Sequence, residues 1–138
     1  MIRNILAALA GLVVGIAVIS LIQKISHSVY PFPSDVQWNN PEAARLALQQ
    51  APVGALLIVL LGYIVGSYAA GLVAAIIGPL AAKRNAILIG AVLTFTGVVN
   101  LVMLPHPVWF WVSVLVYLPF TWLGAKTGMA IKNKNQIV

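Results

Sequence analysis

The side chains best suited to chemistry in this 138-residue chain are its two histidines, His27 and His106. An imidazole can exchange protons near neutral pH, and it is also a common metal ligand. His106 lies between Pro105 and Pro107, and three aromatic residues follow it in the stretch PHPVWFW. This pattern leaves two interpretations, a reactive site and a turn between two membrane spans, and the flanking prolines favour the turn.

A metal site would need further ligands beside the two imidazoles. The chain has only two acidic residues, Asp35 and Glu42, and it has no cysteine. Zinc and other transition metals are usually held by closely spaced histidine, cysteine and carboxylate ligands. Neither a histidine pair four residues apart nor a Cys-His pattern occurs. We therefore predict that the protein binds no metal ion and no cofactor.

The segments that position these histidines are typical of a membrane protein. Hydrophobic residues make up 62% of the chain and charged residues 7%, which is far more apolar than water-soluble domains of this size. A helix satisfies its own backbone hydrogen bonds in lipid. The sequence therefore predicts an all-α, polytopic membrane protein with one domain over residues 1–138. Its four transmembrane helices are expected at residues 5–23, 52–82, 86–104 and 108–131, with an outer loop at residues 24–51.

The outer loop is long enough to hold structure of its own. Asn40 is a good N-cap, Pro41 suits the first helical position, and Glu42 suits the first turn of a helix. The loop is therefore predicted to contain a short helix that lies on the outer membrane surface.

The basic residues predict the orientation of the chain. In a four-span protein, six of the eight lie on one side: Arg3, Lys83, Arg84, Lys126, Lys132 and Lys134. Lys24 and Arg45 lie on the other side, in the loop that also holds both acidic residues. Basic residues accumulate on the cytoplasmic side of membrane proteins. We therefore expect a protein of the bacterial inner (cytoplasmic) membrane with both termini in the cytoplasm, whose net charge of +6 reflects topology and not a nucleic-acid partner.

Small residues recur every four positions in the second span and indicate a tightly packed helix face. The predicted packing residues are Gly62, Gly66, Ala70, Ala74 and Gly78, with Gly11 and Gly15 of the first span. A second row beside them holds Ser67, Gly71 and Ala75, and the fourth span adds Gly124 and Gly128. Missing side-chain bulk lets two helix backbones approach closely in lipid. The face could pack inside one bundle, form a homo-oligomer or larger membrane complex, or line a pore.

The few polar residues inside the spans are expected in two layers. Ser20, Asn100 and Ser113 should share a depth below the outer surface, just under His27 and His106. Tyr63, Thr96 and Tyr117 should share a deeper level. These groups could bridge neighbouring helices, or they could line a small cavity that opens to the outside.

Charged residues are absent from the middle of every predicted span. Proton-coupled carriers need a titratable group at that depth. Small multidrug exporters have a similar size and span count but use a glutamate in the first span, which this chain lacks. Four-helix quinone reductases need paired cysteines, and lipoprotein signal peptidases need two aspartates. The pattern therefore predicts a protein that is not an enzyme.

Three features of the chain bear on its family: the row GYIVGSYAAGLVAA, the span from Asn100 into LPHPVWFW, and the glycines of the last span. Together they resemble an uncharacterised family of small four-span bacterial inner-membrane proteins. The resemblance covers most of the chain and implies no activity. The favoured function is structural or accessory, through the small-residue face and in contact with the lipid bilayer. The alternative is an outward-facing protein that binds a small ligand, a lipid or a metal, or a narrow conduit.

Overall fold

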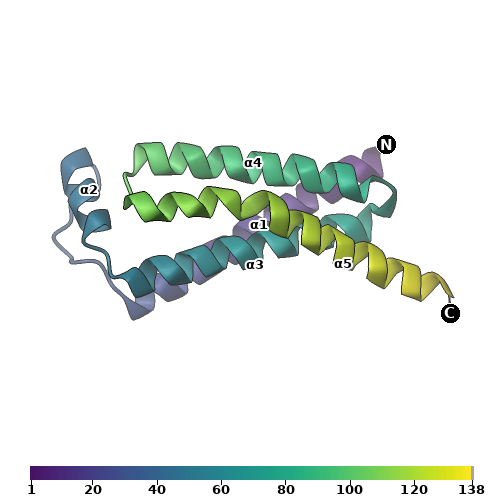
Figure 1. Cartoon of the computed structure of the whole chain (residues 1–138), viewed down its shortest axis with the longest axis horizontal. Helices are drawn as coiled ribbons and strands as arrows, with labels where there is room; N and C mark the ends of the chain where they lie inside the picture. Colours follow the sequence, from purple (N-terminus) through teal and green to yellow (C-terminus); the bar gives the residue numbers. More distant parts are fainter. Residues whose placement is uncertain (138) are drawn as a thin grey trace.

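The computed structural model describes residues 1–137 as a chain of helices, and no strand occurs among them (Figure 1). The α-helices are α1 (Ile2–Val29), α2 (Pro41–Gln49), α3 (Val53–Ile77), α4 (Ala82–Met103) and α5 (Tyr117–Ile137). Two 3₁₀ helices, η1 (Pro79–Ala81) and η2 (Val108–Leu115), precede α4 and α5. Four segments are long and apolar enough to cross a membrane: Ile2–Val29, Val53–Ile77, Pro79–Met103 and Val108–Ile137. The predicted all-α fold with four spans is confirmed.

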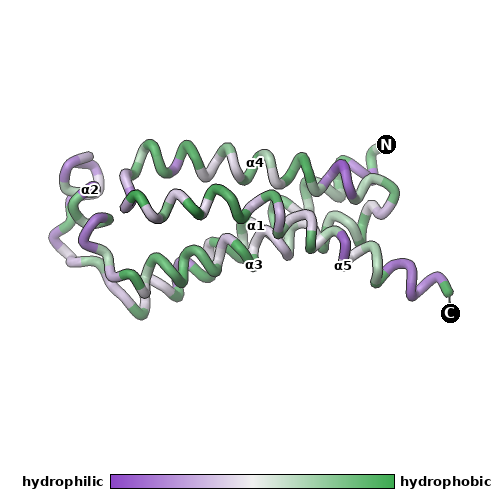
Figure 2. The backbone as a smooth tube through the Cα atoms, in the orientation of Figure 1, coloured by the Kyte–Doolittle hydropathy of each residue, from purple (hydrophilic) through white to green (hydrophobic). Residues whose placement is uncertain are grey.

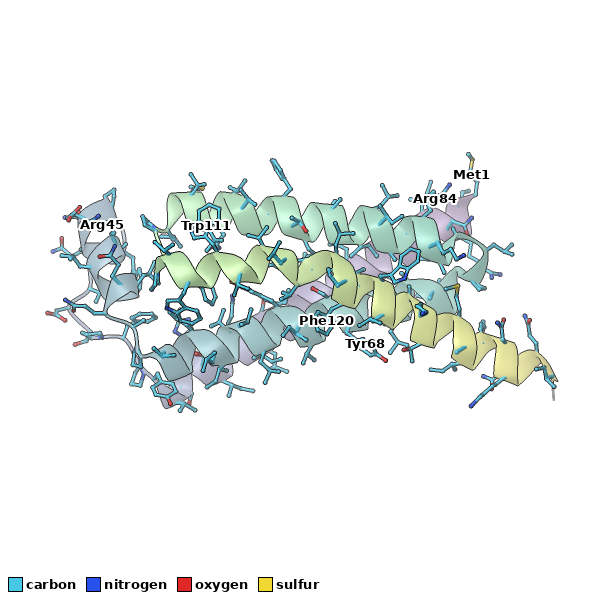
Figure 3. All side chains as sticks on the ribbon, viewed as in Figure 1. Met1, Arg45, Tyr68, Arg84, Trp111 and Phe120 are labelled. Carbon is cyan, nitrogen blue, oxygen red and sulfur yellow. The ribbon has the colours of Figure 1, made fainter. Side chains whose placement is uncertain are left out.

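The four long segments form an elongated bundle with two different ends. Both termini lie at one end, and α2 lies at the other (Figure 1). Polar residues gather around α2 and along the last turns of α5, while apolar residues dominate the helices between them (Figure 2). Large apolar side chains such as Val13, Phe95 and Leu115 point outward and are 65 to 72% exposed, as the radiating side chains in Figure 3 illustrate. A chain with this distribution has the outer surface that lipid requires.

Helix α1 continues further than the apolar run predicts. It ends at Val29, so His27 lies in its last turn and not in a loop. The polar residues that follow the apolar run are compatible with a helix. The helix ends at Val29 because Pro31 disfavours a helical conformation at Tyr30. Helix α2 begins as predicted, because the Asn40 side chain accepts hydrogen bonds from the backbone N–H groups of Glu42 and Ala43.

The fourth span changes its helix type partway along. It begins as the 3₁₀ helix η2 and becomes α-helical at Tyr117. Pro119 gives a physical reason, because its ring lacks an N–H and would clash with the carbonyl of Leu115 in a continuous α-helix. In the first turn of α5 the missing N–H is tolerated. The apolar run predicts a single continuous helix here, and the change of helix type before Pro119 is a difference from that prediction.

Helix α3 packs against α1 with one face and against α5 with another. On the α1 side, a Cβ added to Gly11 would lie 2.5 Å from the Ala70 carbonyl oxygen, and one added to Gly15 would lie 2.8 Å from the Ala70 Cβ. All five residues of the row predicted in the second span are buried: Gly62, Gly66, Ala70, Ala74 and Gly78. This row therefore packs inside one chain, where it is covered by α1.

The second row of α3 packs against α5 even more closely. A Cβ added to Gly71 would overlap the carbonyl oxygen of Thr121, and one added to Gly124 would overlap that of Tyr68. Tyr68 also donates a hydrogen bond of 2.8 Å to the hydroxyl of Thr127. Both rows of small residues are thus occupied by neighbouring helices of the same chain, which leaves neither of them free to contact a second protein or to line a pore.

Polar contacts fasten the end of the bundle that carries the termini. Asn85 is buried, and its side-chain amide donates to the Asn4 carbonyl oxygen at 3.0 Å, which joins α4 to α1. Arg3 donates to the carbonyl oxygen of Ile77 at 3.0 Å, near the C-terminal end of α3. The bond from Arg3 satisfies one of the carbonyl groups that the C-terminal end of α3 leaves unpaired.

Candidate ligand-binding cavity beneath helix α2

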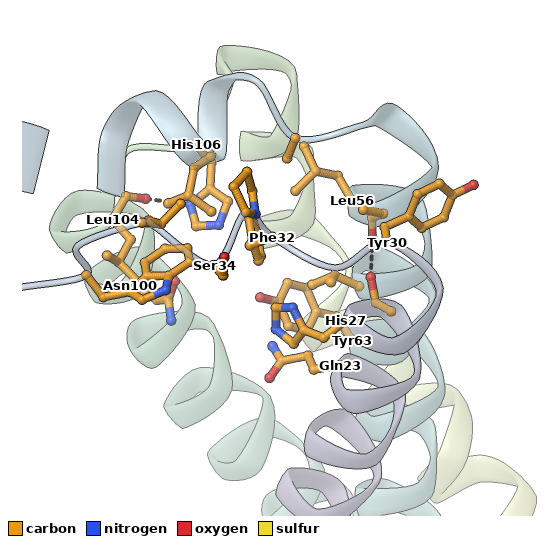
Figure 4. Close-up of a pocket in the computed structure, with 18 residues that line it drawn as sticks. Gln23, His27, Tyr30, Phe32, Ser34, Leu56, Tyr63, Asn100, Leu104 and His106 are labelled. Atoms are coloured by element: carbon orange, nitrogen blue, oxygen red, sulfur yellow. Dashed lines mark hydrogen bonds between the residues drawn. The ribbon is translucent and has the colours of Figure 1, made fainter. Parts of the chain in front are cut away.

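The α2 end of the bundle contains a cavity of about 650 Å³. Its walls come from the last turns of α1, the first half of α3 and the end of α4, and the loop before α2 covers it (Figure 4). Ligand-binding cavities commonly occupy about 300 to 1,000 Å³ and combine apolar walls with a few polar groups. This cavity has that size and mixed lining, which makes it the candidate functional site.

His27 reaches the cavity from the last turn of α1 and contacts an aromatic ring of the covering loop. Its ring lies 5.3 Å from that of Phe32, and Phe32 meets Trp38 edge-on at 5.0 Å. All three residues line the cavity. Contacts of this geometry are favourable between aromatic rings, so they hold the covering loop against α1.

His106 occupies the opposite side of the cavity, and two contacts fix its ring. It stacks on the fully buried Phe110 with ring centroids 5.1 Å apart. Its Nδ1 is hydrogen-bonded to the Leu104 carbonyl oxygen, which can only accept, so Nδ1 carries the proton. Burial lowers the pKa of the His106 imidazole below its usual value, while the bond to Leu104 raises it by a smaller amount. The ring is therefore neutral at neutral pH, with Nε2 as a hydrogen-bond acceptor.

Tyr63 forms the floor of the cavity (Figure 4). Its ring lies 5.3 Å from that of Tyr117 and 6.1 Å from that of Phe110, and it is 8% exposed. Gln23 of α1 lies beside it and adds an amide that can both donate and accept hydrogen bonds. The deepest part of the cavity is thus polar but uncharged.

The structure brings together three of the five residues predicted for an outer polar site. His27, His106 and Asn100 all line the cavity. Ser20 does not, because it lies one residue after Ile19, which packs against α3. A one-residue step turns the side chain by about 100° around a helix, and Ser20 is exposed. Ser113 is buried in η2 and is not part of the lining.

The deeper polar layer is also only partly present. Tyr63 and Tyr117 meet, as expected from their depth, but Thr96 is exposed on α4. Its hydroxyl donates to the Val92 carbonyl oxygen of its own helix at 2.8 Å. Gly97 packs against the Tyr117 ring instead, since a Cβ added to it would lie 2.6 Å from that ring.

Helix α1 contributes more residues to the lining than the sequence predicts. Gln23, Ser26, His27 and Tyr30 all face the cavity, and they follow one another with the i, i+3, i+4, i+7 spacing of a single helix face. That spacing was a usable signal, but it was hidden by the assumption that the helix ends at residue 23. Ser26 also donates to the Ala55 carbonyl oxygen at 3.0 Å, which joins α1 to α3 beside the cavity.

The lining has no fixed charge. None of its residues is Asp, Glu, Lys or Arg, and residues 1–137 contain no cluster of three or more His, Cys, Asp or Glu side chains that could hold a metal ion. Asp35 lines an adjoining hollow of about 500 Å³ between the loop and α2. The cavity therefore offers hydrogen bonds, aromatic faces and apolar walls.

Comparisons of the chain with protein families, with curated proteins and with solved structures gave no match.

Proposed function

We propose that this is a membrane protein that binds a small ligand in the cavity beneath α2. The single observation that carries the proposal is the cavity of about 650 Å³, in which two histidines, each in contact with an aromatic ring, and two amides share the lining with apolar walls. Binding sites in membrane proteins place polar groups where lipid cannot reach them. Polar side chains from α1, from α4 and from the loop after α4 meet in this cavity, namely Gln23, Ser26, His27, Asn100 and His106. This convergence supports binding in preference to a purely structural role.

The helix packing beneath the cavity favours binding over conduction. Below Tyr63, the interior is filled by buried apolar residues, including Ala70, Ile89 and Leu93. The close contact between α3 and α5 at Gly71 and Gly124 also lies below Tyr63. A conduit would need a continuous polar path, whereas a closed floor suits a ligand that enters and leaves by the same side. We propose binding without catalysis.

The location that we propose is the bacterial inner membrane, with both termini in the cytoplasm and the cavity open to the other side. The charge distribution supports it. Lys83, Arg84, Lys132 and Lys134 belong to the end that carries the termini, while α2 holds both Arg45 and Glu42. Any oligomer or larger complex would have to form through other surfaces than the two small-residue rows.

Reporter fusions test this orientation. A fusion after Lys134 is expected to show cytoplasmic activity, and a fusion near Gln37 is expected to show activity outside the cytoplasm, because basic residues are retained in the cytoplasm. A reporter that works only in the cytoplasm and one that works only in the periplasm should give opposite results at the two sites. The reverse pattern at either site would contradict the orientation.

Cysteine labelling tests access to the cavity, since the natural chain has no cysteine. Asn100→Cys is expected to react with a membrane-impermeant maleimide added to the outer side, because Asn100 lines the cavity. Thr96→Cys is the matched control, since this position lies one turn deeper on α4, is exposed and is not in the lining. In lipid it should stay unlabelled. Equal labelling of both variants, or of neither, would contradict an open cavity.

A further inference from the structure

We propose that the cavity takes a neutral, lipid-soluble ring compound with hydroxyl groups, of the alkylhydroquinone class, and that Nε2 of His106 accepts a hydrogen bond from one hydroxyl. This inference rests on the proposed binding function and names its ligand class. Four properties of the site support it: its charge, its depth, the fixed direction of His106 and its aromatic lining.

The charge of the lining argues for a neutral ligand. Phosphate and carboxylate groups are normally held by Arg, by Lys or by several backbone N–H groups. No Arg or Lys lines the cavity, and an unpaired charge is costly to bury. Phospholipids and fatty acids, which carry such groups, are therefore disfavoured as occupants.

The depth of the cavity argues for a ligand that is soluble in lipid. Tyr63 at the floor lies ten residues after Val53, the first residue of α3. A helix rises about 1.5 Å per residue, so the floor is about 15 Å below the start of this span. The bilayer hydrocarbon layer is about 30 Å thick. The ligand must therefore reach well into the membrane, along walls that include Leu56, Val59 and Leu104.

His106 determines which hydrogen-bonding group the ligand presents. The bond from Nδ1 to the Leu104 carbonyl oxygen leaves Nε2 as an acceptor, and stacking on Phe110 holds the ring in place. An acceptor needs a donor, which a hydroxyl supplies and a carbonyl or an ether does not. The amides of Gln23 and Asn100 can donate as well as accept, so they can bond the oxygen at another position of the same ring.

The aromatic lining argues for a flat ring. Phe32 lies between the two histidines, and Trp38 contacts Phe32 edge-on (Figure 4). Aromatic rings interact favourably with other rings through stacked or edge-on contacts. A flat ligand ring beside Phe32 would extend the chain of ring contacts that already links His27, Phe32 and Trp38.

Competition between two matched probes tests the ligand class. The full-length protein in detergent micelles is mixed with equal amounts of decylhydroquinone and its dimethyl ether, and native mass spectrometry counts the bound forms. The ether keeps the ring and the tail but has no donor. We expect about tenfold more bound hydroquinone, since leaving a buried acceptor unpaired has roughly that effect on affinity. Equal binding of both probes would overturn the ligand class and leave the binding function standing. Binding of neither probe would also overturn it, and the labelling of Asn100→Cys would then decide separately whether the cavity is open.

His106→Phe tests the role assigned to Nε2. Phenylalanine keeps a ring against Phe110 but removes the acceptor. The tenfold preference should therefore disappear, and the two probes should bind about equally. The preference compares two ligands on the same folded protein, so a lower yield of the variant does not alter it. Thr96→Val, outside the cavity on α4, is the control and should keep the full preference. An unchanged preference in His106→Phe would overturn the assignment. If that variant does not fold, decylbenzoquinone on the natural protein replaces it, because it has the same carbon skeleton with carbonyls in place of the hydroxyls and so has no donor. Binding as tight as that of the hydroquinone would overturn the assignment.

Discussion

Gly71→Ala and Gly124→Ala should each destabilise the folded bundle by about 3 kcal/mol, at the upper end of the usual cost of overpacking. The added methyl at Gly71 would overlap the Thr121 carbonyl oxygen, and the one at Gly124 would overlap that of Tyr68. Both obstacles are backbone atoms of a neighbouring helix, so no side-chain rotation can relieve the overlap. Helices α3 and α5 would have to separate, and lipid provides little hydrophobic force to restore their contact.

Gly62→Ala is the matched control for both changes, because it adds the same methyl to the same helix as Gly71. The nearest atoms are the side-chain carbons of Ile22 at 3.0 and 3.1 Å, which can move by a few tenths of an ångström. We expect a cost below about 1 kcal/mol. Unfolding in mixed micelles with increasing SDS, followed by tryptophan fluorescence, measures all three. Equal stability of the three variants would contradict the close α3–α5 contact.

Asn85→Leu should destabilise the protein by about 1 to 2 kcal/mol, the upper range for hydrogen bonds between membrane helices. Leucine has nearly the shape of asparagine but cannot donate to the Asn4 carbonyl oxygen. Asn85 is only 1% exposed, so water cannot replace the lost partner. The contact between the beginning of α4 and the beginning of α1 would therefore weaken.

Asn100→Leu is the comparison for Asn85→Leu, since it makes the same replacement near the other end of the same helix. Asn100 is exposed and lines the cavity, so its loss should change the unfolding free energy by less than about 0.5 kcal/mol. The same SDS titration measures both variants. A larger loss in Asn100→Leu than in Asn85→Leu would mean that the buried amide of α4 does not hold the bundle together.

Much of the fold could be predicted from local patterns along the chain. Four long apolar runs predicted four spans, because every helix in lipid must present apolar side chains over a known length. Asn40, Pro41 and Glu42 predicted the start of α2, since capping depends only on neighbouring residues. The four-residue spacing of small residues marked the faces of α3 that pack closely. It could not say which helix covers each face, because that depends on how α1 and α5 are placed around α3.

The candidate site depended on tertiary structure to a much greater extent. Counting residues inward from the membrane surface gave the depth of Ser20 and Thr96, but depth does not determine which side of a helix faces the interior. That side is set by the rotation of each helix against its neighbours, which turned Ser20 and Thr96 outward and Asn100 toward the cavity. The cavity itself arises because α1, α3 and α4 leave space beneath the loop before α2, and such space is a property of three helices together. Only their packing could bring His27 and His106, which are 79 residues apart in the sequence, to opposite walls of one cavity.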